Sequence, residues 1–546
     1  MGYITCTEVG YTTADGRAIF DDLTFRVSPG EHVGLVGANG VGKSTLLRLL
    51  IGQARPDEGH VAVGGTVAYM PQSVAAPGST ATVREMLMGT APADIQEVGT
   101  ELQRLAARLA EGRVDDALAY AEGLERWGML GGYEIEARWD RVCRSVLGAG
   151  FSEIADRPLT TLSGGEGKRL FLEALFASDY DVLLLDEPDN FLDIPAKREL
   201  EDALCATRKT VLVVSHDRAL LRSSVGQILT LEGDAGWIHH GSYASYPEAR
   251  ERRNEQLGDA VKRWHEEERR LYRLVKTFKE RARYSDSWAR KADAAESRWR
   301  RFADPGPPPP PIKGHEISIR LPEVDAARRM LRISDLAIDG MVRAFSDEIY
   351  AGERVGVIGP NGSGKTHLMR VLAEESDGYT GEVDLGARAR VGYFRQSASA
   401  PPDQAKTPIL DTAGRLTGNT ERAMAALARY GLAGQARLSP GAISGGQRAR
   451  FEILCLELRG TNLLLLDEPT DNLDIASGEA LENALAPFDG CVIAVSHDRE
   501  FLRHMTRYLM LLPDGDVLAI PDYDTALACL SDPGSARGTR LVKALS

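Results

Sequence analysis

The stretch GANGVGKS at residues 37–44 decides the fold, and it recurs as GPNGSGKT at 359–366. Both copies have the pattern GxxxxGK[S/T], whose backbone N–H groups wrap around phosphates. The glycines of this pattern permit positive φ and close approach, the lysine neutralises phosphate charge and the hydroxyl binds Mg²⁺. Each copy starts at the last residue of an apolar run that is typical of a strand, HVGLVG at 32–37 or RVGVIG at 354–359. The sequence therefore predicts two phosphate-binding loops.

These loops predict ATP and Mg²⁺ as ligands, because the lysine of such a loop contacts the β- and γ-phosphates. The candidate nucleotide ligands are Gly37, Asn39, Gly40, Gly42, Lys43, Ser44 and Thr45 in the first copy and Gly359, Asn361, Gly362, Gly364, Lys365 and Thr366 in the second. The hydroxyls of Ser44 and Thr366 are the candidate Mg²⁺ ligands within them.

Later motifs repeat at matching intervals. Ser163 precedes Asp186 by 23 residues, and Ser444 precedes Asp467 by the same interval. Self-similarity of this kind marks a duplicated structural unit. We therefore expect two copies of one α/β domain, within residues 1–245 and 326–546.

The first copy holds about 43 residues more than the second. Within Thr100–Tyr133, apolar residues recur at helical spacing on both sides of Gly112. This pattern predicts a helical arm inserted at about 90–140.

Paired acids follow two apolar runs, VLLLDEP at 182–188 and LLLLDEP at 463–469. Such runs are typical of buried strands in a parallel sheet. The first acid of each pair, Asp186 or Asp467, is expected to hold Mg²⁺, largely through water. The second, Glu187 or Glu468, is expected to act as the base that polarises the attacking water.

Two histidines stand in nearly identical strings, His216 in VVSHDR and His497 in AVSHDR. A lone histidine is more often structural. The repeated setting after an apolar run favours a shared role, contact with the γ-phosphate.

The segment between the copies, 246–325, is expected to be a helical linker that ends in PGPPPPP at 305–311. Residues 269–301 carry 12 basic and 4 acidic side chains, with five aromatic residues among them. Basic and aromatic residues together suit contact with nucleic-acid phosphates and bases. If Pro247–Glu280 is one helix, Arg283–Trp288 forms the tip before a returning helix. The alternative is a solvated helical spacer.

Composition excludes several classes of protein. The 546 residues are 43% hydrophobic, so packed domains are expected, and no apolar run is long enough to span a bilayer. The N-terminal residues do not resemble a secretory signal. The six cysteines are scattered, which disfavours metal clusters and disulfides, and a reducing cytoplasm is expected. The net charge of −14 disfavours nucleic-acid binding over the whole surface.

These motifs resemble the ATP-binding cassette superfamily. LSGGE at 162–166 and ISGGQ at 443–447 are similar to its signature motif, and Asp193 and Asp474 to its D-loop acid. The resemblance implies that Gln72 and Gln396 contact nucleotide and Mg²⁺. It also implies a parallel-sheet core with a helical signature subdomain in each cassette, and hydrolysis at both sites.

In this superfamily two cassettes sit head to tail, and the signature of one closes the phosphate site of the other. The helix expected to start at each SGG can bind a γ-phosphate with its N-terminus. The first site would comprise Lys43, Ser44, Gln72, Asp186, Glu187 and His216 with Ser444, Gly445 and Gly446. The second would comprise Lys365, Thr366, Gln396, Asp467, Glu468 and His497 with Ser163, Gly164 and Gly165.

Some positions depart from the superfamily pattern. Tyr11 resembles its adenine-stacking aromatic residue, but no counterpart occurs around 336–341. DEPDNFLD in the first copy has Asp189 and Phe191 where DEPTNHLD is usual, and His367 replaces a threonine. We interpret Phe191 as packing at the interface between the cassettes.

Twin cassettes, an arm in the first and a charged helical linker resemble the ABC-F family. The resemblance implies a monomer that binds the ribosome, with its linker reaching the P-site tRNA and rRNA near the peptidyl-transferase centre. The residues expected at the ribosome-contacting tip are Arg281, Arg283, Tyr284, Trp288, Arg290 and Lys291. Resistance to macrolide, lincosamide or streptogramin antibiotics is the favoured role. The alternatives are a housekeeping translation factor and the ATPase subunit of a separate exporter.

Overall fold

The computed structural model of the chain describes residues 2–73, 80–283, 286–311, 329–395, 406–471 and 473–531. It divides into two compact units. One comprises residues 1–238 and 315–546 and holds both copies of the repeat, and the other comprises His239–Gly314. The linker unit thus begins before the predicted boundary at 246.

The first cassette combines a six-stranded sheet of order β5-β6-β7-β3-β8-β9 with a three-stranded sheet of order β2-β1-β4. β3 pairs in parallel with β7 and β8, whereas β1 pairs antiparallel with β2 and β4. The strands are β1 (Tyr3–Thr12), β2 (Ala18–Val27), β3 (His32–Gly37), β4 (Glu58–Gly64), β5 (Val67–Met70), β6 (Val182–Asp186), β7 (Thr210–Val214), β8 (Gln227–Glu232) and β9 (Ala235–His239).

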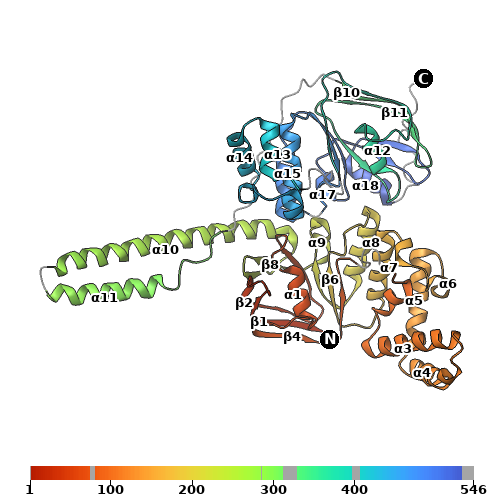
Figure 1. Cartoon of the computed structure of the whole chain (residues 1–546), viewed down its shortest axis with the longest axis horizontal. Coiled ribbons are helices and arrows are strands. Elements are labelled where there is room, and N and C mark those ends of the chain that lie inside the picture. The colour runs from red at the N-terminus through yellow and green to blue at the C-terminus, as the bar shows by residue number, and fades with distance from the viewer. Residues whose placement is uncertain are drawn as a thin grey trace. The chain divides into compact units, whose positions relative to one another are not determined.

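Helices surround these sheets (Figure 1). They are α1 (Lys43–Leu50), α2 (Val83–Met88), α5 (Gly132–Leu147), α6 (Phe151–Ile154), α7 (Gly164–Phe176), α8 (Ile194–Ala206) and α9 (Arg218–Ser224). Leu46 and Leu47 of α1 are fully buried in one apolar core with residues of both sheets. Burial of each leucine contributes about 1.5–3 kcal/mol, so this core fixes the start of α1 beside the end of β3.

The second cassette repeats this architecture, with sheets of order β14-β15-β16-β12-β17-β18 and β11-β10-β13. Its strands are β10 (Arg329–Ile338), β11 (Val342–Tyr350), β12 (Arg354–Ile358), β13 (Thr380–Leu385), β14 (Val391–Phe394), β15 (Leu463–Asp467), β16 (Cys491–Val495), β17 (Arg507–Leu511) and β18 (Val517–Ile520). Its helices are α12 (Lys365–Leu372), α13 (Ile409–Thr417), α14 (Thr420–Arg429), α15 (Gly445–Leu458), α16 (Ile475–Leu485), α17 (Arg499–Leu502) and α18 (Tyr523–Ser531).

The apolar runs that precede the paired acids form the centre of each large sheet. Every residue of β6 and of β15 is buried. Both faces of these strands are therefore covered, which explains why their sequences are continuously apolar rather than alternating. The α/β class and the twin-cassette architecture are confirmed.

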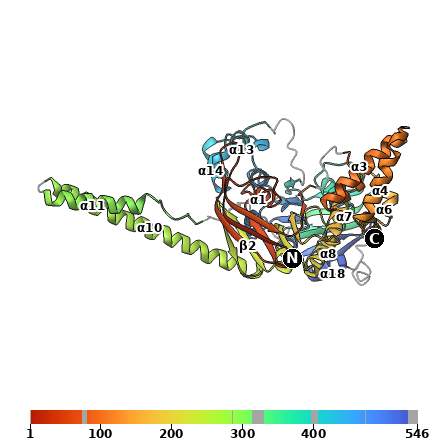
Figure 2. The same cartoon turned by 90° about the horizontal axis from the view of Figure 1, so that it is seen from below.

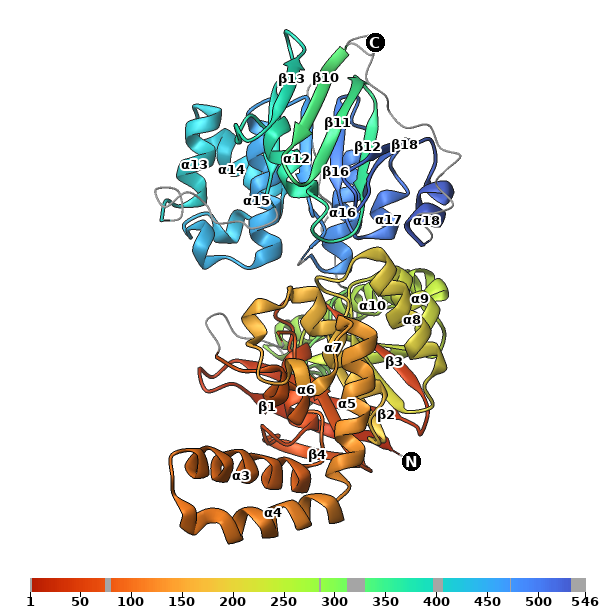
Figure 3. The ribbon, with the colours of Figure 1, turned by 90° about the vertical axis from the view of Figure 1, so that its right-hand side faces the viewer.

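The inserted arm consists of α3 (Ala93–Ala110) and α4 (Ala117–Met129), which lie side by side in Figure 3. Gly112 sits between them with φ of 89°, a left-handed conformation that glycine adopts at little cost. The first helix starts earlier than predicted, because Ile95 and Val98 pack in the interior.

The linker unit is a helical hairpin of α10 (Tyr246–Ala282) and α11 (Asp286–Ala303), which run beside each other in Figures 1 and 2. Leu271 and Val275 of α10 and Ala292 of α11 are buried. The predicted long helix and returning helix are confirmed, but the returning helix already begins at Asp286, so Trp288 lies on it and not before it.

Several aromatic residues of the hairpin contact each other across its two helices. The rings of Trp264 and Phe302 stack at 5.6 Å, and those of Tyr272 and Trp299 lie 5.4 Å apart. Both pairs join α10 to α11. These contacts help to hold the two helices together, while Tyr272 remains 52% exposed.

Candidate functional site

Each P-loop joins a central strand to a helix. In the first, Gly40 and Gly42 have φ of 78° and 111°, and α1 begins at Lys43. In the second, Gly362 and Gly364 have φ of 81° and 92°. These left-handed residues aim successive N–H groups into the loop, the arrangement that cradles phosphates. Gly37, Gly359, Thr45 and Asn361 belong to the same two loops.

The P-loop lysines are buried and point back into their own loops. Lys43 Nζ donates to the carbonyl oxygens of Gly37 at 2.8 Å and Ala38 at 3.2 Å. Lys365 Nζ makes the equivalent bonds to Gly359 and Pro360, both at 2.9 Å. Burial lowers the pKa of each lysine from its usual value. A phosphate group in the loop would supply the opposite charge that these buried ammonium groups need.

The first acid of each pair faces the hydroxyl of the P-loop. Asp467 Oδ1 lies 3.4 Å from Thr366 Oγ1, and burial raises the pKa of this carboxyl. In the first cassette, burial raises the pKa of Asp186 while a hydrogen bond from Ser44 lowers it. Carboxylate and hydroxyl oxygens are hard donors of the kind Mg²⁺ prefers. The donor set therefore fits Mg²⁺ in both cassettes.

A tyrosine missed by sequence reasoning orients each of these acids. Tyr393 donates its hydroxyl to Asp467 Oδ2 at 3.2 Å, and Tyr69 bonds to Asp186. Both tyrosines stand three residues before the glutamine of their cassette. This common offset is a signal that could have identified them.

The second acids lie beside the histidines. Glu187 Oε1 is 3.9 Å from His216 Nε2, and Glu468 Oε1 is 3.4 Å from His497 Nε2. Burial lowers the pKa of both histidines, so each is neutral at pH 7. Neither ring nitrogen of His216 has a hydrogen-bond partner among the described residues. A buried unpaired imidazole facing the acid fits a role in contacting a bound phosphate.

The D-loop acids join the two cassettes. Asp474 Oδ2 accepts the N–H of Asn39 at 3.4 Å, and Asp193 Oδ2 accepts the N–H of Asn361 at 3.3 Å. The other oxygen of each carboxylate caps its own helix, α16 or α8. Each P-loop is therefore held by the opposite cassette.

The signature motifs also face the opposite P-loops. Ser163 and Ser444 are the N-caps of α7 and α15, as the sequence predicted. A Cβ placed on Gly165 would lie 3.5 Å from Asn361 Nδ2, and one on Gly446 would lie 4.0 Å from Asn39 Nδ2. These glycines permit the close approach that the head-to-tail arrangement needs.

Two cavities lie between the cassettes. One, of about 450 Å³, is lined by residues of the first site and of the second cassette, among them Asn39, Gln72, Glu187, His216, Gly445 and Asp474. The other, of about 460 Å³, is lined among others by Ser163, Gly164, Gly165, Lys365, Thr366, Glu468 and His497. Each cavity thus brings together part of one predicted residue set, and the roles of the individual residues remain predictions.

Other predicted residues are placed differently. Tyr11 pairs with Phe20 across β1 and β2 and is not part of the described lining of the first cavity. Gln396 and Tyr284 lie outside the described residues. The interpretation of Phe191 as interface packing is wrong, since its side chain is 60% exposed and its carbonyl oxygen accepts a bond from Asn361 Nδ2 at 3.0 Å.

The described tip residues present positive charge. Arg281, Arg283, Arg290 and Lys291 are exposed. Trp288 is half-buried against Phe278, with the Lys291 ammonium 4.4 Å from its ring centre. Cations gathered around one indole leave their remaining N–H donors available to an anionic partner.

Comparison with known proteins shows the family. A family model described as "ABC transporter" matches residues 20–190 and 342–471. The chain is 41% identical to an "Antibiotic resistance protein" of Mycobacteroides abscessus, covering 95% of this chain and 98% of the relative. The chain belongs to the ABC-F family of ATP-binding cassette ATPases.

Further relatives support this placement. Identity is 34% to "Tylosin resistance ATP-binding protein TlrC" of Streptomyces fradiae, covering 92% of this chain and 96% of that one. The chain is 32% identical to "Energy-dependent translational throttle protein EttA" of Mycobacterium tuberculosis, over 90% of this chain and 88% of that relative. The solved structure titled "RNase-L Inhibitor" has the same fold, with a TM-score of 0.61 and 19% identity. The match covers 96% of this chain and 93% of that structure. This ABC-F protein binds and hydrolyses ATP.

The two ATP sites of this ABC-F protein differ beside the second acid. Asn190 Nδ2 donates to Glu187 Oε2 at 2.6 Å, and Gln72 Nε2 donates to the same atom at 2.5 Å. The residue that corresponds to Asn190 is Asp471, a departure that sequence reasoning overlooked. Burial, and next the charge of Asp471, raise the pKa of Glu468 to about 8. The two candidate bases therefore have different neighbours, two amide donors beside Glu187 and a carboxylate near Glu468.

Within the described part of the chain, no helix combines the length and apolar character that crossing a membrane requires.

Proposed function

We propose that this ABC-F ATPase binds the ribosome and protects it from macrolide, lincosamide or streptogramin antibiotics. The exposed cationic tip of the hairpin carries the proposal, because it suits contact with rRNA and P-site tRNA on a chain that is otherwise acidic. The names of the two resistance relatives support the choice of role.

In the proposed mechanism, each ATP joins both cassettes of one monomer. The P-loop lysines and the opposite signature serines bind the phosphates, and Glu187 or Glu468 accepts a proton from the attacking water. Mg²⁺ held by Ser44 and Asp186, or by Thr366 and Asp467, would neutralise charge on the phosphates. Loss of the γ-phosphate removes the bridge between cassettes, so ATP controls the population of the closed form.

Ribosome binding is tested by trapping the closed form. The double variant Glu187→Gln/Glu468→Gln is expected to sediment with ribosomes in ATP and to remain in the supernatant without nucleotide. The matched control adds Arg281→Ala, Arg283→Ala, Arg290→Ala and Lys291→Ala, and we expect it to close but to lose most of the ribosome binding. A double variant that never sediments with ribosomes would contradict the proposal.

Drug protection is tested by expression in a susceptible bacterium. The wild-type protein is expected to raise the inhibitory concentration of tylosin, a lincosamide or a streptogramin at least about fourfold, and the double glutamine variant is expected to fail because it cannot cycle. The similarity to EttA favours a second candidate, a housekeeping translation factor. Ribosome binding without any change in drug sensitivity would select that candidate.

A further inference from the structure

A buried lysine crosses from one cassette to the catalytic loop of the other. Lys197, on α8 of the first cassette, is 8% exposed. Its ammonium donates to the carbonyl oxygen of His497 in the second cassette at 3.0 Å. It also lies 3.0 Å from Asp217 Oδ2. A cation buried to this degree is retained only with such partners.

The partners of Lys197 all belong to elements of the two ATP sites. Asp217 directly follows His216, and the buried Asp189 stands two residues after Glu187. His497 donates its backbone N–H to Glu468 Oε2 at 3.0 Å. One ammonium group thus connects the histidine loop of the first site to the histidine loop of the second.

This connection has no counterpart on the other side. At the positions that correspond to Asp189 and Lys197, the second cassette has Thr470 and Gly478. Thr470 Oγ1 lies 3.3 Å from Ser496 Oγ, and a Cβ on Gly478 would meet no atom within 4 Å. The space that a matching lysine would cross is therefore open.

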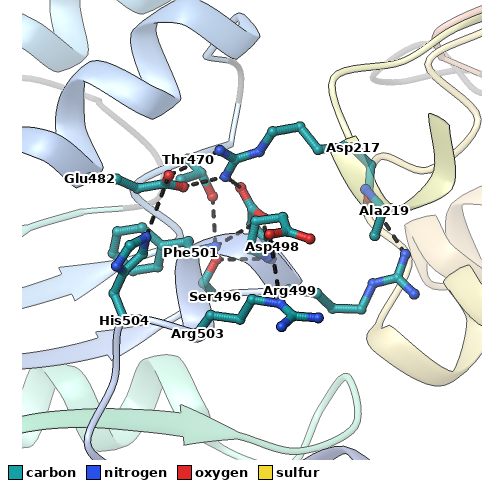
Figure 4. A network of polar contacts seen from close by, with 12 residues as sticks. Asp217, Ala219, Thr470, Glu482, Ser496, Asp498, Arg499, Phe501, Arg503 and His504 are labelled. Atoms are coloured by element: carbon teal, nitrogen blue, oxygen red, sulfur yellow. Dashed lines mark hydrogen bonds and ion pairs between the residues drawn. The ribbon is translucent and has the colours of Figure 1, made fainter. Parts of the chain in front are cut away.

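The surrounding ion pairs, in contrast, are present in both directions. Arg218 pairs with Glu482, and the corresponding Arg499 pairs with Glu201. Figure 4 shows Glu482 and Arg499 in this network, together with Asp217. Arg499 Nη2 lies 3.4 Å from Asp217 Oδ1. These two arginine–glutamate pairs are thus present in both directions, whereas the second cassette has no lysine at the position of Lys197.

The charges within the cluster support an ionised lysine. Burial alone would lower the pKa of Lys197, but the carboxylates of Asp217 and Asp189 outweigh burial and raise it. The positive charges of Lys197 and Arg499 hold the pKa of Asp217 below its usual value. The ammonium is therefore charged at pH 7 and makes a charge-assisted bond to the His497 carbonyl.

We infer that Lys197 is a positioning residue for hydrolysis at the site of Lys365 and Glu468. It holds the loop that carries His497 from the opposite cassette, and through Asp217 it joins that loop to the histidine loop of the first site. At the site of Lys43 and Glu187, the corresponding position on the opposite cassette is Gly478, so no lysine from that position reaches the His216 carbonyl oxygen. The inference rests on the assignment of Glu468 and His497 to the second ATP site.

The test measures each site separately by single-turnover ATP hydrolysis without ribosomes. In the Glu187→Gln background, Lys197→Met is expected to lower the rate at the second site about tenfold with little change in ATP affinity, the pattern expected when a transition-state contact is lost. In the Glu468→Gln background the same substitution is expected to change the rate less than about twofold.

Two further variants separate positioning from folding. Asp189→Thr/Lys197→Gly introduces the residues found in the second cassette and leaves no unpaired lysine. It should reproduce the loss at the second site, while retained turnover at the first site in the Glu468→Gln background shows that the protein is folded. Lys197→Arg restores a cation and should recover most of the rate. Equal losses at both sites, or a changed affinity with an unchanged rate, would overturn the inference. If the Glu468→Gln variant without further substitutions still hydrolysed ATP at the second site, both the inference and the assignment of Glu468 to this site would be overturned. Ribosome binding does not enter this test.

Discussion

Ser163→Arg is expected to abolish hydrolysis at the site of Lys365 while sparing the site of Lys43. Ser163 caps α7 and lines the cavity that contains Lys365 and Glu468. A Cβ on nearby Gly165 would already lie 3.1 Å from the Phe191 carbonyl oxygen. Arginine at position 163 removes the hydroxyl that caps α7 and places a much larger side chain at the edge of this cavity. Loss of such a preorganised anion-binding group lowers the rate by about 100-fold or more.

The measurement is single-turnover hydrolysis in the two single-glutamine backgrounds. Ser163→Arg should lose activity in Glu187→Gln, where only the second site has its base, and keep it in Glu468→Gln. Ser444→Arg is the matched control and should show the reverse pattern. If each substitution damaged the site of its own cassette, the head-to-tail assignment of the sites would be refuted.

Arg218→Ala is expected to weaken closure of the cassettes about 100-fold. Arg218 Nη1 lies 2.9 Å from Glu482 Oε2 across the interface, and the two side chains are 11% and 8% exposed. Removing one partner of a buried pair leaves an uncompensated charge, which costs about 3–5 kcal/mol. Closure can be followed by fluorescence transfer between labels on the two cassettes during an ATP titration of the double glutamine variant.

A double-mutant cycle with Glu482→Ala isolates this interaction. The double variant is expected to be less impaired than the sum of the single variants, with a coupling of about 2 kcal/mol or more. The exposed pair Arg343 and Asp516, with side chains 62% and 28% exposed, is the control, and Arg343→Ala should change closure by less than about 0.5 kcal/mol. Purely additive losses would show that the Arg218 contact does not stabilise the closed form.

The local motifs could be predicted without the structure because a few consecutive residues determine their geometry. The P-loop needs only a strand end, glycines with positive φ and a lysine six residues after the first glycine. The same holds for Ser163 and Ser444, where a serine before two glycines predicts a helix start. The copies also supported each other, since the P-loops, signatures, paired acids and histidines each occur twice, with equal spacing from signature to histidine.

Other residues could not be assigned from the sequence because their partners lie far away in the chain. Periodicity places Trp264 and Trp299 on helices, but it does not say whether a ring faces solvent or the other helix. Asp189 stood out as a departure, but the sequence does not show that it is buried or that its charge raises the pKa of Lys197 on the next helix. Asp471 was passed over, although comparison with Asn190 in the first copy would have revealed it.

The amino-acid order alone therefore established two ATP-binding cassettes, their acids and histidines, and a basic helical hairpin between them. Only the tertiary structure decided that Asp193 and Asp474 hold the opposite P-loops, and that Lys197 reaches His497 on one side alone. The physical reason is that these contacts depend on how the two cassettes pack. Hydrogen bonds of about 3 Å between residues some 300 positions apart leave no periodic pattern in a single sequence.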